Sequence, residues 1–192
     1  MKKHALKEVV VGKLMFIGLC AAGLALAAPA WSSAPAITPT SIAGARLGQS
    51  AAAYRKLLGA AQALTGTNAD PSHPEDYSRL YFAKREMEVY FKGKTNKAIE
   101  ITTWNRAYRT PAGVGPCSTV AQLKKAYGAS LKASPDNSHG NTVFAYVVGR
   151  NMLFATNANP YVTAVAIFTP SAHREPTLGY AGYVVLNEVN CF

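Results

Sequence analysis

The feature that most constrains the fold is one helix-capping pattern that occurs twice, 69 residues apart. Residues 44–59 read GARLGQSAAAYRKLLG, and residues 113–128 read GVGPCSTVAQLKKAYG. Each copy has a glycine-rich turn, a hydroxyl residue suited to cap a helix, apolar residues at helical spacing, and a closing glycine. The pattern predicts two similar helices and an internal repeat. Any two capped short helices would share these features, and the first helix could instead continue to Leu64.

Each predicted helix is followed by a polar loop and three strand-like segments. The first set is the loop 71–76 with strands 77–83, 86–92 and 98–104, and the second is the loop 134–141 with strands 143–148, 152–156 and 161–168. Within 86–92, Met87, Val89 and Phe91 alternate with polar residues, which is the period of a half-buried strand. We therefore expect Glu86, Glu88 and Tyr90 on an outward face. A last strand is expected at 180–189.

These patterns predict an α+β fold of two tandem units, each laying a helix on an antiparallel sheet like an α/β sandwich. The first unit is expected at 43–110 and the second, with the C-terminal strand, at 111–192. Residues 31–42, which are rich in Ser, Pro and Ala, are expected to form a flexible linker before them. The length of 192 residues fits one domain or two small ones.

Residues 1–30 have the features of a secretory signal peptide. Four lysines precede the uncharged apolar run 14–27, and small-x-small sites end at Ala27 and Ala30. The apolar run has 14 residues, fewer than the roughly 20 that span a bilayer. We predict cleavage near Ala27 or Ala30, export to the cell envelope or beyond, and no membrane span in the mature chain. Alternatively, Cys20 is lipidated, and the protein is an anchored envelope assembly factor.

Removal of residues 1–30 leaves two cysteines, Cys117 and Cys191. An even pair in an oxidising compartment predicts a disulfide, which would hold the last strand against the second helix. The alternative makes Cys117 a nucleophile, because a helix N-terminus lowers the pKa of a thiol. Such a site needs a nearby histidine base, and the candidates are His73, His139 and His173. The protein would then be an exported enzyme of an unrecognised type.

Other chemistries find little support in the residue pattern. The mature histidines stand 66 and 34 positions apart, without the short spacing of a zinc site. The acidic residues do not indicate a pair of carboxylates across a cleft. Residues 113–119 lack the lysine of a phosphate-binding loop. We therefore predict no catalytic residue, no metal and no cofactor.

Charge and aromatic residues point to a binding surface. The mature part holds 16 Lys and Arg against 9 Asp and Glu, a net charge of +7, which suggests affinity for acidic partners such as envelope polymers. An ordinary solvated surface is the alternative. The basic residues are scattered and the chain is expected to be exported, so nucleic acid is not expected. Aromatic residues are frequent in both predicted sheets. We predict binding through a sheet face by Tyr81, Tyr90, Lys92, Trp104 and Arg106, with ordinary cross-strand packing as the alternative.

The segment 108–119, YRTPAGVGPCST, with Leu123 and Tyr127-Gly128 after it, resembles a motif of uncharacterised secreted bacterial proteins. The tandem plan is similar to that of the beta-lactamase inhibitory proteins, and each unit is similar to the small barrel-assembly lipoproteins of the outer membrane. The resemblance covers about residues 42–169, and motif agreement is confined to 108–128. It implies a non-enzymatic binding module. No inhibitor contact residue matches a position here, so none is carried over.

We therefore expect a secreted, monomeric, non-catalytic binding protein. Its expected partner is a protein or an anionic polymer of the cell envelope. The exported enzyme and the lipid-anchored assembly factor stand as alternatives.

Overall fold

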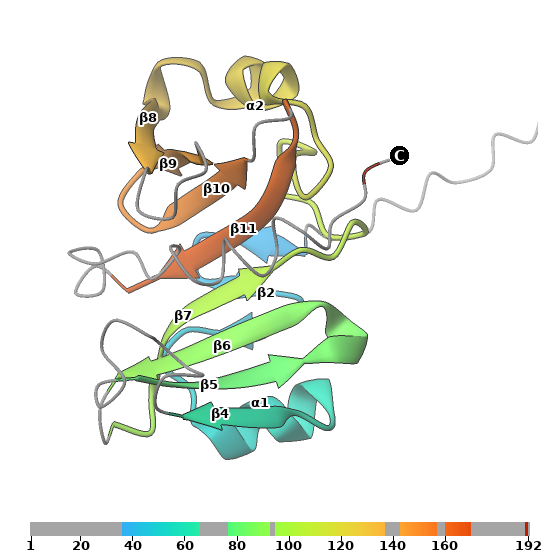
Figure 1. Cartoon of the computed structure of the whole chain (residues 1–192), viewed down its shortest axis with the longest axis vertical. Helices are drawn as coiled ribbons and strands as arrows, with labels where there is room; N and C mark the ends of the chain where they lie inside the picture. Colours follow the sequence, from blue (N-terminus) through green and yellow to red (C-terminus); the bar gives the residue numbers. More distant parts are fainter. Residues whose placement is uncertain are drawn as a thin grey trace, which may run out of the picture. The chain divides into compact units, whose positions relative to one another are not determined.

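Eight antiparallel strands form the main sheet of the protein (Figure 1). A computed structural model describes residues 36–65, 77–92, 95–136, 143–156, 160–169 and 191. In spatial order the sheet contains β4 (Gln62–Thr65), β5 (Tyr77–Phe82), β6 (Met87–Lys92), β7 (Ala98–Thr103), β11 (Val162–Phe168), β10 (Met152–Thr156), β9 (Val143–Val148) and β8 (Leu131–Asp136). Mixed helix and sheet, with strands predominating, confirm the α+β class.

The chain order within the sheet is simple. Helix α1 (Ala51–Leu58) precedes β4, β5, β6 and β7, and helix α2 (Val120–Tyr127) precedes β8, β9, β10 and β11. Each group of four strands is a meander, and the pairing of β7 with β11 joins the two groups into one sheet. The colours of Figure 1 show this junction, where green β7 lies beside orange-red β11.

Both helices pack on the same face of the sheet. That face carries Val89, Ile101 and Ile167 in register across β6, β7 and β11, and all three side chains are buried. Tyr54 of α1 contacts Phe91 edge to face, with ring centroids 6.0 Å apart. Tyr127 of α2 lies 5.5 Å from Phe154 of β10 by the same measure. Burial of this apolar face is the main source of stability for both helices.

Each helix begins at the hydroxyl residue that the sequence predicted. The Ser50 side chain accepts a hydrogen bond from the Ala53 N–H, and that of Thr119 accepts one from the Gln122 N–H. Both helices have eight residues, and their caps at Gly59 and Gly128 have positive φ. The first helix therefore ends at Leu58, and the alternative extension to Leu64 is wrong, because residues 62–65 form β4.

A small three-stranded sheet precedes α1. It consists of β1 (Ile37–Thr38), β2 (Ser41–Ile42) and β3 (Ala45–Arg46). Ile37 and Ile42 are fully buried in the main core, and the Ile37 N–H donates to the Arg109 carbonyl at 3.0 Å. The prediction of a flexible linker over 31–42 is thus wrong for residues 36–42, since their apolar side chains belong to the core.

The structure adds two strands to the predicted set. Strands β5, β6, β7, β9, β10 and β11 confirm the six predicted segments within a few residues, whereas β4 and β8 at the two edges were not predicted. Residues 134–136 of the predicted loop belong to β8. Short 3-10 turns occupy Ala83–Arg85 and Gly128–Ser130. The signal peptide, the loop 71–76 and the strand 180–189 are predictions that lie outside the described residues.

Candidate functional site

The face of the sheet opposite the helices carries a polar cluster on β5, β6 and β7. The register places Tyr90 between Arg79 and Glu100, and it places Glu88 opposite Thr102. All five side chains are buried. Alternation along β6 explains the arrangement, because Met87, Val89 and Phe91 project to the helix side and the residues between them to this side. We call these five residues the polar cluster.

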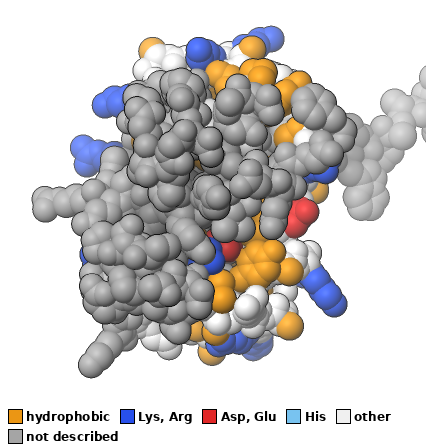
Figure 2. All heavy atoms as spheres, in the orientation of Figure 1, with side chains coloured by type: hydrophobic (Ala, Val, Ile, Leu, Met, Phe, Trp, Pro, Cys, Tyr) orange, Lys and Arg blue, Asp and Glu red, His pale blue; other side chains and the backbone are white. Residues whose placement is uncertain are grey.

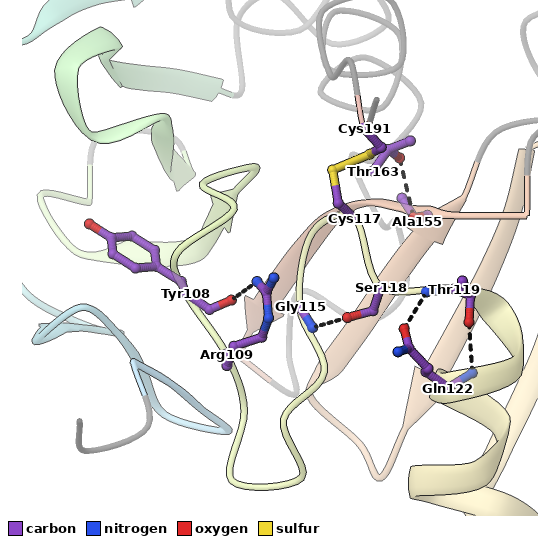
Figure 3. Close-up of a disulfide and its surroundings, with 10 residues drawn as sticks. All are labelled: Tyr108, Arg109, Gly115, Cys117, Ser118, Thr119, Gln122, Ala155, Thr163 and Cys191. Atoms are coloured by element: carbon purple, nitrogen blue, oxygen red, sulfur yellow. Dashed lines mark hydrogen bonds between the residues drawn. A yellow bond between two sulfur atoms is a disulfide. The ribbon is translucent and has the colours of Figure 1, made fainter. Parts of the chain in front are cut away.

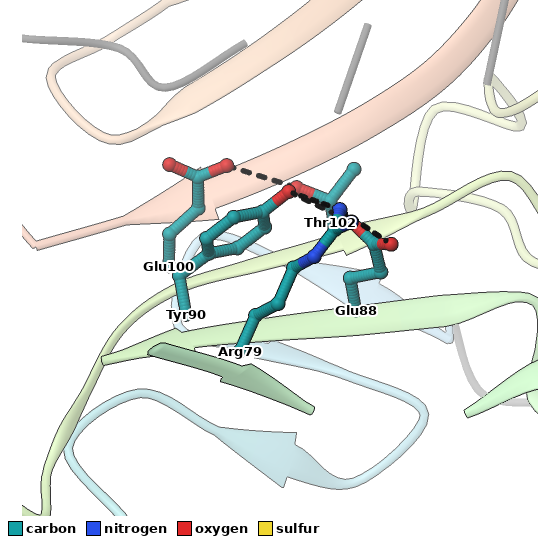
Figure 4. A network of polar contacts seen from close by, with 5 residues as sticks. All are labelled: Arg79, Glu88, Tyr90, Glu100 and Thr102. Carbon is teal, nitrogen blue, oxygen red and sulfur yellow. Dashed lines mark hydrogen bonds and ion pairs between the residues drawn. The ribbon is translucent and has the colours of Figure 1, made fainter. Parts of the chain in front are cut away.

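Arg79 and Glu88 form the centre of the polar cluster (Figure 4). The Arg79 Nη1 group donates to both carboxylate oxygens of Glu88, at 3.0 and 3.1 Å, and lies 3.4 Å from the Tyr90 hydroxyl. The Tyr90 hydroxyl donates to Glu88 Oε2 at 2.7 Å. Thr102 donates to Glu100 Oε1 at 3.0 Å. Charges removed from water in this way need such partners, because an isolated buried charge is strongly destabilising.

An apolar patch on β10 and β11, together with the residue that follows β7, extends the same face. It consists of Trp104, Leu153, Ala155, Ala164, Ala166 and Phe168, with Tyr81 packed against it. The Tyr81 and Trp104 rings are stacked, with centroids 5.9 Å apart and an interplanar angle of 14°. This contact lies in the range in which aromatic pairs attract each other beyond simple area burial. The second face of the sheet is therefore a polar cluster bordered by an apolar patch.

The structure separates the five predicted binding residues into two groups. Tyr90 is fully buried and Trp104 is 6% exposed, so the prediction of an outward Tyr90 is wrong. Alternation along β6 placed Tyr90 on the correct face of the sheet, but that face is buried too. For Tyr90, the alternative interpretation of ordinary cross-strand packing is therefore the better one. Tyr81 is half-buried, and Lys92 and Arg106 are exposed.

Glu88 requires a similar correction. We expected it on an outward face, yet it is buried against Arg79. The structure also brings in Arg79, Glu100 and Thr102, which the sequence reasoning missed. The available signal was the opposite charge of Arg79 on β5 and Glu88 on β6. Using this signal requires knowing which residues of the two strands face each other, and the residue pattern does not show that.

Burial gives the polar cluster a definite protonation state at Tyr90. Desolvation raises the pKa of Tyr90 well above 10.0, and the nearby carboxylates of Glu88 and Glu100 raise it further. The hydroxyl therefore stays protonated and serves as a hydrogen-bond donor to Glu88. A phenol held in this state is a positioning group for the carboxylate rather than a base or a nucleophile.

Cys117 and Cys191 form the predicted disulfide, with their Cα atoms 5.3 Å apart (Figure 3). The Cys117 N–H donates to the Val162 carbonyl at 2.7 Å, which holds the bridge beside β11. A bridged sulfur has no thiolate, so Cys117 is no standing nucleophile in this state. The candidate bases His73, His139 and His173 lie outside the described residues.

Charge is sorted between the interior and the surface. The described residues include 14 Lys and Arg, of which 12 are exposed, Arg109 is half-buried and Arg79 is buried. By contrast, Glu88 and Glu100 are buried and Glu86 is half-buried. Figure 2 shows the basic side chains at several separate positions rather than in one patch. Because Arg79 is buried with Glu88 and Glu100, burial withdraws a net of one negative charge from the surface.

Within the described ranges, no three His, Cys, Asp or Glu side chains gather closely enough to hold a metal ion. None of the helices in the described part of the chain is long and apolar enough to cross a membrane. No protein-family model, no curated protein and no solved structure matches this chain.

Proposed function

We propose that this chain is an exported, non-catalytic binding protein that engages an anionic polymer of the cell envelope. The observation that carries the proposal is the sorting of charge. Twelve basic side chains of the described residues are exposed, while the polar cluster buries two carboxylates, Glu88 and Glu100, with one arginine, Arg79. Long-range attraction to a polyanion depends on the summed charge of the molecule, and the exposed Lys and Arg side chains place positive charge where a polymer can contact it directly.

One feature of the sequence and one of the structure support the export part of the proposal. Residues 1–30 have the charge and apolar pattern of a cleaved signal peptide, which would release the mature chain into the envelope or the medium. The Cys117–Cys191 bridge is the kind of cross-link that persists in oxidising compartments.

The proposal also includes a tandem origin of the fold. Each half of the chain runs from a capped eight-residue helix into four antiparallel strands, and the two helix segments align without gaps. We propose that the two halves are repeat units that share one sheet through β7 and β11. A continuous sheet provides a wider surface than either unit alone.

The contact region that we propose is the rim of the sheet face. Lys92 and Arg106 are exposed there, at the two ends of the polar face formed by β6 and β7. Tyr81 is half-buried and stacks on Trp104. The buried Tyr90 and Trp104 would hold this rim in shape and would not touch the polymer themselves.

Binding of the exported protein to heparin, used as a polyanionic glycan probe, tests the proposal. Affinity should fall at least roughly tenfold between about 50 and 200 mM salt, as several neutralised charges require. Neutral dextran should not bind. The double variant Lys92→Gln/Arg106→Gln should bind more weakly than the charge-matched control Lys124→Gln/Lys125→Gln on α2. Absence of heparin binding at low salt would overturn the proposal, and equal loss in both variants would overturn the rim as the contact region.

The other functional hypotheses have no specific observation in their favour. Cys117 is bridged, and the histidines and Cys20 lie outside the described residues. Capture of one acidic protein that survives high salt would instead favour a protein partner.

A further inference from the structure

A cleft lies between α1 and the end of the sheet formed by β4, β5 and β6. Its volume is about 290 Å³, and Ala51 and Arg55 of α1 line one side. The sheet side is lined by Ala63, Leu64, Ser78, Arg79, Leu80 and Phe91, and Thr95 and Asn96 complete the lining. Figure 1 shows α1 alongside β4 at this end of the sheet. The lining is mostly apolar, as in many small-molecule sites.

Small side chains create this space. Ala51 is the first residue of α1, and Ala63 and Ser78 lie on the strands beneath it. In the aligned segment of the second half, the position of Ala51 is occupied by Val120, which packs against the core. Ala51 is thus smaller than its counterpart Val120, and the cleft lies at this position of α1.

Three polar groups in the lining are available as hydrogen-bond donors. The Asn96 Oδ1 atom accepts a hydrogen bond from the Ala51 N–H at 3.2 Å. This bond fixes the orientation of the side-chain amide and leaves its NH₂ group available to donate to a ligand. Across the part of the chain that the structure describes, neither the Arg55 guanidinium nor the Ser78 hydroxyl has a side-chain partner. The lining contains no carboxylate. The lining also includes Arg79, which is paired with Glu88, and Thr95, whose hydroxyl donates to the Lys92 carbonyl. A largely apolar cleft with Arg55 and the donors of Ser78 and Asn96 is suited to an anion with an apolar tail.

We propose that this cleft binds a small amphipathic carboxylate of roughly ten non-hydrogen atoms, since a water molecule occupies about 30 Å³ in the liquid. The apolar tail would lie against Leu80 and Phe91, which are buried in the core. Arg55 would hold the carboxylate through a charge-assisted hydrogen bond. This site is independent of the polymer binding proposed above, because it depends on one local cleft rather than on distributed surface charge.

Calorimetric titration of the exported protein with octanoate tests the site. We expect saturable binding with one site per chain, and much weaker binding of octanol, which has the same tail without the charge. Arg55→Gln should weaken octanoate binding about tenfold, in line with the loss of one hydrogen bond to a charged group. Lys56→Gln, the neighbouring exposed charge on α1, is the matched control and should bind like the parent.

A second variant separates the cleft from general charge effects. Ala51→Leu places a larger side chain in the cleft, keeps a strong helix former in α1, and should abolish octanoate binding. Its thermal unfolding should match that of the parent, and heparin binding should be unchanged, which distinguishes this site from polymer binding. The proposal is overturned if octanoate does not saturate, or if Arg55→Gln and Ala51→Leu both bind it like the parent.

Discussion

Gly115 has no room for a side chain. A Cβ atom at this position would lie 2.1 Å from the Tyr108 carbonyl oxygen and 3.0 Å from Arg109 Nη1. The close approach is fixed on both sides, because Arg109 Nη1 donates to the Tyr108 carbonyl at 2.8 Å and the Gly115 N–H donates to Ser118 Oγ at 3.0 Å. Figure 3 shows how these residues converge beside the disulfide. Packing of the loop between β7 and α2 thus explains why this glycine is needed.

Gly115→Ala should lower the free energy of unfolding by roughly 3 kcal/mol, the upper range for overpacking of a close contact. The matched control is Gly113→Ala in the same loop. Gly113 has φ +76 with nothing within 4 Å of a Cβ, so its cost is backbone strain alone, about 1–2 kcal/mol. Urea unfolding of both variants measures the difference. Equal losses would contradict the steric explanation.

Tyr90 makes the stability of the fold sensitive to alkaline pH. Its pKa is raised well above 10.0 by burial, and burial also raises the pKa of Tyr54. The folded state therefore keeps protons that the unfolded chain loses above about pH 10. Stability that is fully present below that pH is lost as the pH rises further.

Unfolding free energy should decline above pH 10 by up to about 1.4 kcal/mol per pH unit for each of these two tyrosines. Tyr90→Phe should be less stable at neutral pH, because it loses the hydrogen bond to Glu88, but its decline above pH 10 should be shallower. Denaturant unfolding across the pH range measures both quantities. An identical slope in the variant and the parent would show that Tyr90 titrates normally.

The elements depend on local caps as well as on core packing. Helix α2 begins with a complete capping box, in which the Thr119 Oγ1 atom accepts from the Gln122 N–H at 3.1 Å and Gln122 Oε1 accepts from the Thr119 N–H at 2.8 Å. Both bonds satisfy N–H groups that a helix of eight residues cannot pair internally. A short helix with a single buried leucine, Leu123, is expected to depend strongly on them.

Thr119→Ala should therefore cost about 1 kcal/mol of unfolding free energy, a typical value for loss of an N-cap. Thr119→Ser keeps the capping oxygen and should retain most of the stability. Chemical unfolding followed by circular dichroism provides the comparison. If serine is as destabilising as alanine, then the methyl group rather than the cap is responsible.

Element prediction succeeded where the residue pattern itself carried the period. Strand β6 alternates clearly, and the hydroxyl caps marked both helix starts. The edge strand β4 reads QALT, which does not alternate. The edge strand β8 reads LKASPD and includes Pro135, which is unfavourable inside a sheet. These segments are strands because β5 and β9 offer backbone partners, a tertiary contribution that local pattern does not contain.

For the whole molecule, the disulfide is the longest-range covalent constraint. It joins residues 74 positions apart, so in the chain-entropy model it removes many conformations from the unfolded chain. Cys191→Ser should lower the unfolding free energy by about 4 kcal/mol. Reduction of the parent should give a similar loss, and the unreduced mature chain should show no free thiol. A thiol that reacts in the native exported protein would contradict the bridge and revive Cys117 as a nucleophile.

The sequence alone determined the secondary-structure class, both helix starts, six strands and the cysteine pair. The helices and strands depend on neighbouring residues, and the disulfide followed from there being only two cysteines after residue 30. The sequence also indicated that Tyr81, Tyr90 and Trp104 belong to the sheets. Only the tertiary structure decided that Ile37 and Ile42 join the core, and that the polar cluster of Arg79, Glu88, Tyr90, Glu100 and Thr102 is buried. The physical reason is that alternation assigns a side chain to a face of the sheet, whereas its exposure depends on everything packed against that face.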